Sequence, residues 1–151
     1  MPNPIDVFVS YAREDASFMR ELRTHLTLLE RQGLMKLWYD GDITAGSAWG
    51  EAIDSQLEAA KIILLLVSAD FLASDFIDEV ELKRALARHR EGTARVIPII
   101  VRGCDWTKAP FAKLQALPRD GKAMATLRDR DAGWTEVAKA LRAILESYVL
   151  A

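Results

Sequence analysis

The spacing of apolar residues changes repeatedly along the chain and predicts alternating strands and helices. Unbroken apolar runs are typical of strands buried on both faces of a parallel sheet, whereas apolar residues three or four positions apart indicate amphipathic helices. The clearest run is Ile62–Val67, which ends at Ser68. The predicted strands are 5–9, 36–39, 62–67, 95–101 and 122–126. The predicted helices are 16–32, 49–60, 74–90 and 133–150.

This alternation predicts one α/β domain spanning residues 1–151. Strands that alternate with helices form right-handed crossovers, so we expect a five-stranded, doubly wound parallel sheet with helices on both faces. Pro98 cannot donate a ladder hydrogen bond, which indicates that strand 95–101 lies at an edge or carries a bulge. Such sheets bind ligands at the carboxyl ends of their strands, so the loops there are the first place to look for chemistry.

One carboxylate stands apart on the helix that follows the clearest strand. Ser74 is expected to cap the start of this helix. At about 100° per residue, Glu81 points between Ile77 and Ala85 and away from Lys83. A carboxylate with apolar neighbours at this edge of a sheet is a candidate for ligand chemistry. An ordinary carboxylate at the border of solvent explains the same pattern.

The same edge collects other side chains that suit a nucleotide. They are Ser10, Tyr11, Arg13, the loop 40–47, Trp49 and Ser68. Aromatic rings can stack on a base, and a guanidinium can pair with phosphate. Each has an ordinary alternative, because Tyr11 could be a half-buried loop aromatic, Arg13 a solvated charge and Trp49 a core anchor.

Composition and missing motifs disfavour several other functions. A net charge of −2 gives no electrostatic case for binding nucleic acid or a membrane. One cysteine, Cys104, excludes an internal disulfide and fits a reducing cytoplasm, and with two histidines it disfavours a zinc site. The first strand is followed by neither a dinucleotide fingerprint nor a P-loop. Ser10 lies in no nucleophile elbow, and a phospho-accepting receiver domain would need aspartates where Ser10 and Ser68 stand.

Four ordered motifs cover almost the whole chain. They are Asp6–Asp15, Trp38–Trp49, Leu64–Phe76 continued by Val80–Leu82, and Ile97–Trp106 continued by Leu114–Pro118 and Asp120–Lys122. Together they resemble the Toll/interleukin-1 receptor (TIR) domain family, and its NAD⁺-cleaving bacterial branch in particular. Gly103 departs from that branch, in which proline often precedes the cysteine, but it alters no site residue.

The resemblance implies a flavodoxin-like fold and a set of site residues. In enzymatic members a glutamate of the active-site helix is catalytic, and that position corresponds to Glu81. Ser10, Tyr11 and Arg13 correspond to the first loop, where related enzymes contact the nucleotide. Ile43, Ser47 and Trp49 correspond to a mobile loop that borders the site and packs against a neighbouring chain. NAD⁺ would be the substrate, so no cofactor and no metal are expected.

The resemblance also implies a function. We expect an NAD⁺ glycohydrolase that gives nicotinamide and either ADP-ribose or a cyclic ADP-ribose isomer, two outcomes that the sequence does not separate. Activation by oligomerisation, as a dimer or filament, and a cytoplasmic role in defence against phage with a fused or partner sensor domain are expected too. The alternative is a non-catalytic TIR–TIR interaction or adaptor module. Glu81 favours the enzyme, because adaptor members often lack that residue. The chain would be a single TIR domain, whole or excised from a longer multidomain protein.

Overall fold

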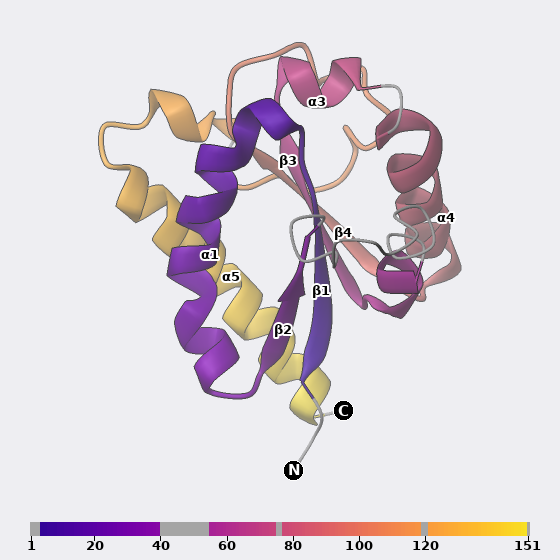
Figure 1. Cartoon of the computed structure of the whole chain (residues 1–151), viewed down its shortest axis with the longest axis vertical. Helices are drawn as coiled ribbons and strands as arrows, with labels where there is room; N and C mark the ends of the chain where they lie inside the picture. Colours follow the sequence, from indigo (N-terminus) through magenta and orange to yellow (C-terminus); the bar gives the residue numbers. More distant parts are fainter. Residues whose placement is uncertain (1–3, 40–54, 75–76, 119–120, 151) are drawn as a thin grey trace, which may run out of the picture.

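A computed structural model describes residues 4–39, 55–74, 77–118 and 121–150. Within them, parallel strands form one sheet in the order β2-β1-β3-β4 (Figure 1). The strands are β1 Ile5–Ser10, β2 Met35–Trp38, β3 Ile62–Val67 and β4 Arg95–Ile100. The helices are α1 Ala16–Arg31, α3 Ala69–Ala73, α4 Lys83–Glu91 and α5 Arg130–Leu150. Shorter helical segments are η1 Arg13–Asp15, η3 Ile77–Leu82 and η5 Met124–Thr126.

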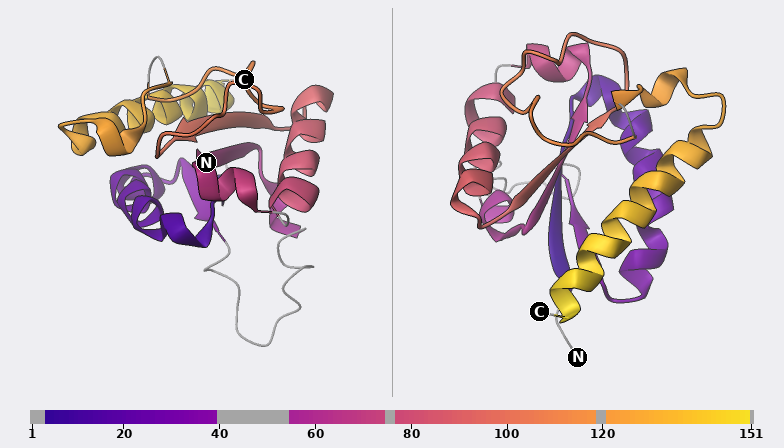
Figure 2. Two further views of the ribbon diagram at one scale, coloured as in Figure 1. Left: turned by 90° about the horizontal axis from the view of Figure 1, so that it is seen from above. Right: turned by 180° about the vertical axis from the view of Figure 1, so that it is seen from behind.

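The sheet lies between two helical layers, as the alternating pattern predicts. Figure 2 shows α1 and α5 on one side of the sheet and α4 on the other. Successive residues of a strand point to opposite faces. Ile62, Leu64 and Leu66 of β3 therefore pack with α1 and α5, and the other three residues of that strand pack toward α3 and α4. Every residue of β3 is buried, which explains why its sequence is an unbroken apolar run.

The first four predicted strands are confirmed, each to within one residue at either end. The predicted edge position of Pro98 is confirmed as well, because β4 is the last strand of the described sheet. The carbonyl of Pro98 accepts a hydrogen bond from the Leu117 N–H at 2.9 Å, on the side away from β3. Helix 16–32 is also confirmed, as α1, and the predicted helix 133–150 begins slightly earlier, as α5. Of the predicted helix 49–60, residues 55–59 are helical and residues 49–54 lie outside the described residues.

The fifth strand predicted at 122–126 is wrong. Met124–Thr126 forms a short 3₁₀ helix, and a single parallel bridge between Ile99 and Leu117 extends the sheet beyond β4. The misleading signal has a physical cause. Ala123 and Met124 pack into the two apolar clusters on opposite faces of the sheet, so they alternate as strand residues do without joining a ladder.

Within the helix predicted at 74–90, the described residues form two segments, η3 and α4, and a further short helix, α3, precedes them. Ser68 caps a separate short helix, α3, by accepting the Phe71 N–H at 3.1 Å. Ser74 accepts the Ile77 N–H at 3.2 Å, so its predicted cap contact is confirmed. The helix then opens with the π-helical segment η3 and continues as α4. Segments of this type occur frequently at functional sites.

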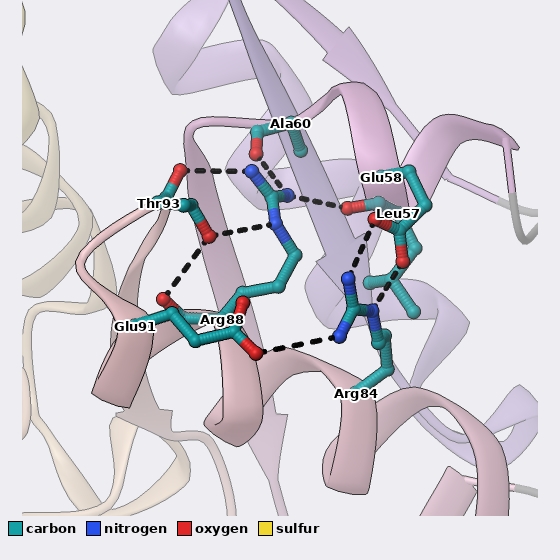
Figure 3. A network of polar contacts seen from close by, with 7 residues as sticks. All are labelled: Leu57, Glu58, Ala60, Arg84, Arg88, Glu91 and Thr93. Atoms are coloured by element: carbon teal, nitrogen blue, oxygen red, sulfur yellow. Dashed lines mark hydrogen bonds and ion pairs between the residues drawn. The ribbon is translucent and has the colours of Figure 1, made fainter.

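The buried side chain of Arg88 connects α4 to the helical turn 55–59 by hydrogen bonds (Figure 3). Its guanidinium donates to the carbonyl oxygens of Leu57 at 2.6 Å, of Thr93 at 2.8 Å, and of Ala60. The side chain is only 6% exposed. Carbonyls at the end of a helix carry partial negative charge, so they can satisfy a buried cation without a carboxylate. Nearby, Arg84 makes an exposed, two-pronged pair with Glu58.

Replacing Arg88 should destabilise the fold far more than replacing Arg84. Arg88→Met keeps much of the side-chain volume but leaves buried carbonyls without donors, so we expect the free energy of unfolding to fall by about 3 kcal/mol. Arg84→Met removes an exposed pair and should have a much smaller effect. Urea unfolding followed by tryptophan fluorescence measures both. Equal losses in the two variants would contradict the assignment of Arg88 as a buried clamp.

Candidate active site

Two serines at the carboxyl edge of the sheet each bind a carboxylate from another element. Ser10 ends β1 and donates its hydroxyl to Oε2 of Glu81 at 2.8 Å. Ser68 follows β3 and donates its hydroxyl to Oδ2 of Asp15. All four side chains are buried. Strands β1 and β3 are neighbours in the sheet, so the two serine–carboxylate pairs belong to one edge.

Glu81 is buried by its own helix and by the end of β1. It lies in η3 among the buried side chains Ile77, Leu82 and Ala85, and it is 5% exposed. The predicted position on an apolar flank is therefore confirmed, and the alternative of a carboxylate bordering solvent is wrong. A buried carboxylate is costly unless hydrogen bonds compensate its charge. Ser10, which lies 71 positions earlier in the chain, supplies one such bond.

A second carboxylate, Asp15, is held by Arg102, a cation that is not among the predicted site residues. Nε of Arg102 donates to Oδ1 of Asp15 at 2.7 Å, and Nη2 of Arg102 donates to Asp70. These hydrogen bonds, first to Asp15 and then to Asp70, raise the pKa of the Arg102 guanidinium above its ordinary value, so it stays charged. Asp15 follows β1, Asp70 opens α3 after β3, and Arg102 follows β4. One guanidinium therefore joins three loops.

A signal for Arg102 was present in the sequence. It is the first charged residue after the buried run 96–101, so it stands at the same sheet edge as Ser10 and Ser68. All the predicted side chains of this edge lie in or beyond the loops after the first three strands. The loop after the fourth strand reaches the same edge and carries Arg102.

The other predicted residues are placed in part. Tyr11 is half-buried beside Tyr39, with ring centroids 6.3 Å apart, so its ordinary alternative as a loop aromatic matches its packing. Arg13 is exposed in η1, between Ser10 and Asp15 in the chain. The structure thus brings Ser10 to Glu81 and Tyr11 to Tyr39. Ile43, Ser47 and Trp49 lie outside the described residues.

Features of other kinds of site are few in the described part of the chain. In that part, no group of three or more His, Cys, Asp or Glu side chains could hold a metal ion. Burial raises the pKa of the half-buried Cys104 thiol, so little of it is thiolate near neutral pH. Among the helices described, we find none with the length and apolar character needed to cross a membrane.

The chain has relatives of known family. A family model described as TIR domain matches residues 7–142, a span that includes both serine–carboxylate pairs and Arg102. An uncharacterized protein of Sinorhizobium fredii, y4lF, is 48% identical over 136 residues, which are 90% of this chain and 42% of y4lF. The 2′ cyclic ADP-D-ribose synthase AbTIR of Acinetobacter baumannii is 32% identical over 96 residues, which are 62% of this chain and 34% of AbTIR. The chain thus spans less than half the length of either relative.

Solved structures show the same fold. The TIR domain of the Toll-related receptor TRR-2 from Hydra magnipapillata superposes with a TM-score of 0.65 at 23% identity, covering 90% of this chain and 97% of that domain. The TIR domains of the activated Roq1 resistosome give a TM-score of 0.69 at 14% identity, covering 91% of this chain and 99% of that one. With the family match over residues 7–142, the resemblance seen in the sequence is confirmed, and the chain belongs to the TIR domain family.

Proposed function

We propose that this TIR domain is an NAD⁺ glycohydrolase and that Glu81 is its catalytic residue. The observation that carries the proposal is a carboxylate buried at the carboxyl edge of the sheet, on a π-helical segment, and oriented by a hydroxyl from the end of β1. A catalytic group must be held in a fixed geometry, and the Ser10 hydrogen bond does this for Glu81. The likeness to AbTIR, a 2′ cyclic ADP-D-ribose synthase, supports the same substrate class.

The chemistry requires a carboxylate rather than an acid. When the bond between nicotinamide and ribose breaks, the bonding electrons go to the ring nitrogen, and nicotinamide leaves as a neutral molecule. The ribose develops oxocarbenium character, which a nearby carboxylate stabilises electrostatically. Water then adds to the anomeric carbon and loses a proton to give ADP-ribose. A hydroxyl within the same molecule can add instead and give a cyclic isomer.

The remaining residues divide between orientation and binding. Ser10 was predicted to contact the substrate, and its hydrogen bond to Glu81 supports a role in orienting the catalytic carboxylate. Tyr11 and Arg13 on the first loop are proposed to contact the nucleotide. Ile43, Ser47 and Trp49 are proposed to border the site on the following loop. NAD⁺ is the substrate in this scheme, and no further cofactor enters it.

The proposal extends to regulation in the cell. The chain covers 42% of y4lF and 34% of AbTIR, which is compatible with a TIR domain joined to a sensor domain. The Roq1 TIR domains belong to a resistosome that recognises a pathogen effector. By analogy we propose that self-association, as a dimer or filament, activates this chain, and that NAD⁺ loss in the cytoplasm then halts a phage-infected cell.

Glu81→Gln should abolish most turnover without unfolding the protein. The amide keeps an acceptor for Ser10 but removes the negative charge, so nicotinamide release should fall by about a hundredfold or more. Chromatography of nicotinamide and nucleotide products after incubation with NAD⁺ measures the rate. Glu91→Gln on the exposed end of α4 is the matched control and should leave the rate unchanged. Nicotinamide release by Glu81→Gln at the parent rate would mean that Glu81 is not the catalytic residue. A parent protein that releases no nicotinamide at any concentration would favour the non-catalytic TIR–TIR module.

Specific activity should rise with protein concentration. If self-association completes the site, the rate per chain increases as monomers convert to assemblies and levels off when all chains are assembled. Nicotinamide release over a wide concentration range, with light scattering on the same samples, relates rate to assembly. A rate per chain that stays constant while the assembled fraction grows argues against this control.

A further inference from the structure

We propose that Arg102 is a positioning residue for the candidate active site. In this view Arg102 holds Asp15, and through Asp15 it holds the segment 11–14, so that Tyr11 and Arg13 stand in a geometry that binds the dinucleotide. The substrate in this inference rests on the proposed function. The structural part, that Arg102 fixes Asp15 and its loop, does not.

Asp15 binds Arg102 and does not form the side-chain hydrogen bond that would cap its own helix. It occupies the N-cap position of α1, where an aspartate usually accepts a hydrogen bond from a backbone N–H and so stabilises the helix by about 1 kcal/mol. No such bond forms here. Both carboxylate oxygens face inward instead, one toward Arg102 and one toward Ser68, and the side chain is 0% exposed. Departures from local rules of this kind are expected at functional sites.

Two fixed points bracket the segment that carries the predicted nucleotide contacts. At one end Ser10 is fixed by β1 and by Glu81. At the other end Asp15 is fixed by its carboxylate, and its backbone N–H donates to the carbonyl of Ala12 at 2.8 Å. Without Arg102, Asp15 keeps only the Ser68 hydroxyl of these two side-chain partners, which loosens residues 11–14 while the bond between Ser10 and Glu81 remains. Arg102 should therefore affect substrate binding more than the chemical step.

The guanidinium is suited to this task by its shape. It donates to Asp15 and Asp70 at the same time, and Asp70 lies in the first turn of α3, which Ser68 caps through the Phe71 N–H. Arginine offers its donors in a rigid planar fork, whereas lysine offers a compact charge on a flexible stem. Arg102→Lys therefore preserves the charge but loses the fixed relation between the two carboxylates.

A direct contact with a substrate phosphate is the competing role. The Arg102 side chain is 36% exposed, so this role is physically accessible. The two roles differ in the protein without substrate. A positioning residue changes the protection of backbone N–H groups near Asp15 even when no nucleotide is present, whereas a group that only binds phosphate leaves them unchanged.

The test combines hydrogen exchange with nucleotide binding in the full chain. Exchange is measured at the N–H groups of Asp15 and Phe71 in the parent protein and in Arg102→Lys. Binding of NAD⁺ is measured by NMR titration in a Glu81→Gln background, in which we expect turnover to be slow. We expect Arg102→Lys to accelerate exchange at both sites and to weaken NAD⁺ binding, each by about tenfold.

Two further variants control the result. Arg84→Lys is the matched control, because Arg84 also pairs through two nitrogens but with Glu58 on a different part of the surface, and it should alter neither measurement. Asp70→Asn removes the negative charge from one of the two acceptors of Arg102 and leaves Asp15 bound to Arg102. It should produce smaller changes in hydrogen exchange and in NAD⁺ binding. If Arg102→Lys folds poorly, Asp70→Asn tests the inference in its place.

Each outcome has a distinct meaning. Unchanged exchange at Asp15 in Arg102→Lys overturns the inference, and weaker NAD⁺ binding with unchanged exchange assigns Arg102 to direct phosphate contact instead. Faster exchange with unchanged NAD⁺ binding restricts Arg102 to fold stability, which also overturns its role toward the substrate. Failure of Glu81→Gln with intact Arg102 to bind NAD⁺ counts against the proposed function. In that case the dinucleotide part falls, and the exchange data still decide whether Arg102 fixes Asp15.

Discussion

The carboxyl edge of the sheet depends on one requirement, that a buried carboxylate must find hydrogen-bond donors. Water no longer solvates Asp15 and Glu81, so the protein has to supply partners from elsewhere in the chain. The hydroxyls at the ends of two neighbouring strands supply them. Because each partner comes from a different element, satisfying these charges also fixes how α1, α3 and η3 meet the sheet.

This requirement links fold and site. An apolar edge would pack without directional bonds and would tolerate small shifts between the helices. A set of charged and hydroxyl groups has few arrangements in which all partners are satisfied, so it selects one. Ser10 satisfies Glu81 in this way, and Arg102 satisfies Asp15. The groups available for chemistry are therefore the groups that hold the loops.

Sequence reasoning succeeded where the spacing of apolar residues alone determined the structure. The run Ile62–Val67 gave a strand with both ends correct because each of its side chains is buried, and the helical spacing placed Glu81 on a buried flank. It failed at 122–126, where apolar residues pack alternately into the clusters on the two faces of the sheet but form no ladder of strand hydrogen bonds. The partnership of Ser10 and Glu81 depends on the β1–β3 register, which spacing along the chain does not specify. The proposed enzymatic role of Glu81 rests on the family resemblance, not on periodicity.

Arg88 has a mechanical consequence. Its bonds to Leu57 and Ala60 connect the helical turn 55–59 to α4, and η3 with Glu81 directly precedes α4 in the chain. We expect a displacement of this turn to move α4 with it, because the buried guanidinium would lose its acceptors if the two moved apart. A neighbouring molecule bound at the turn would then change the position of Glu81 without a change in the strands.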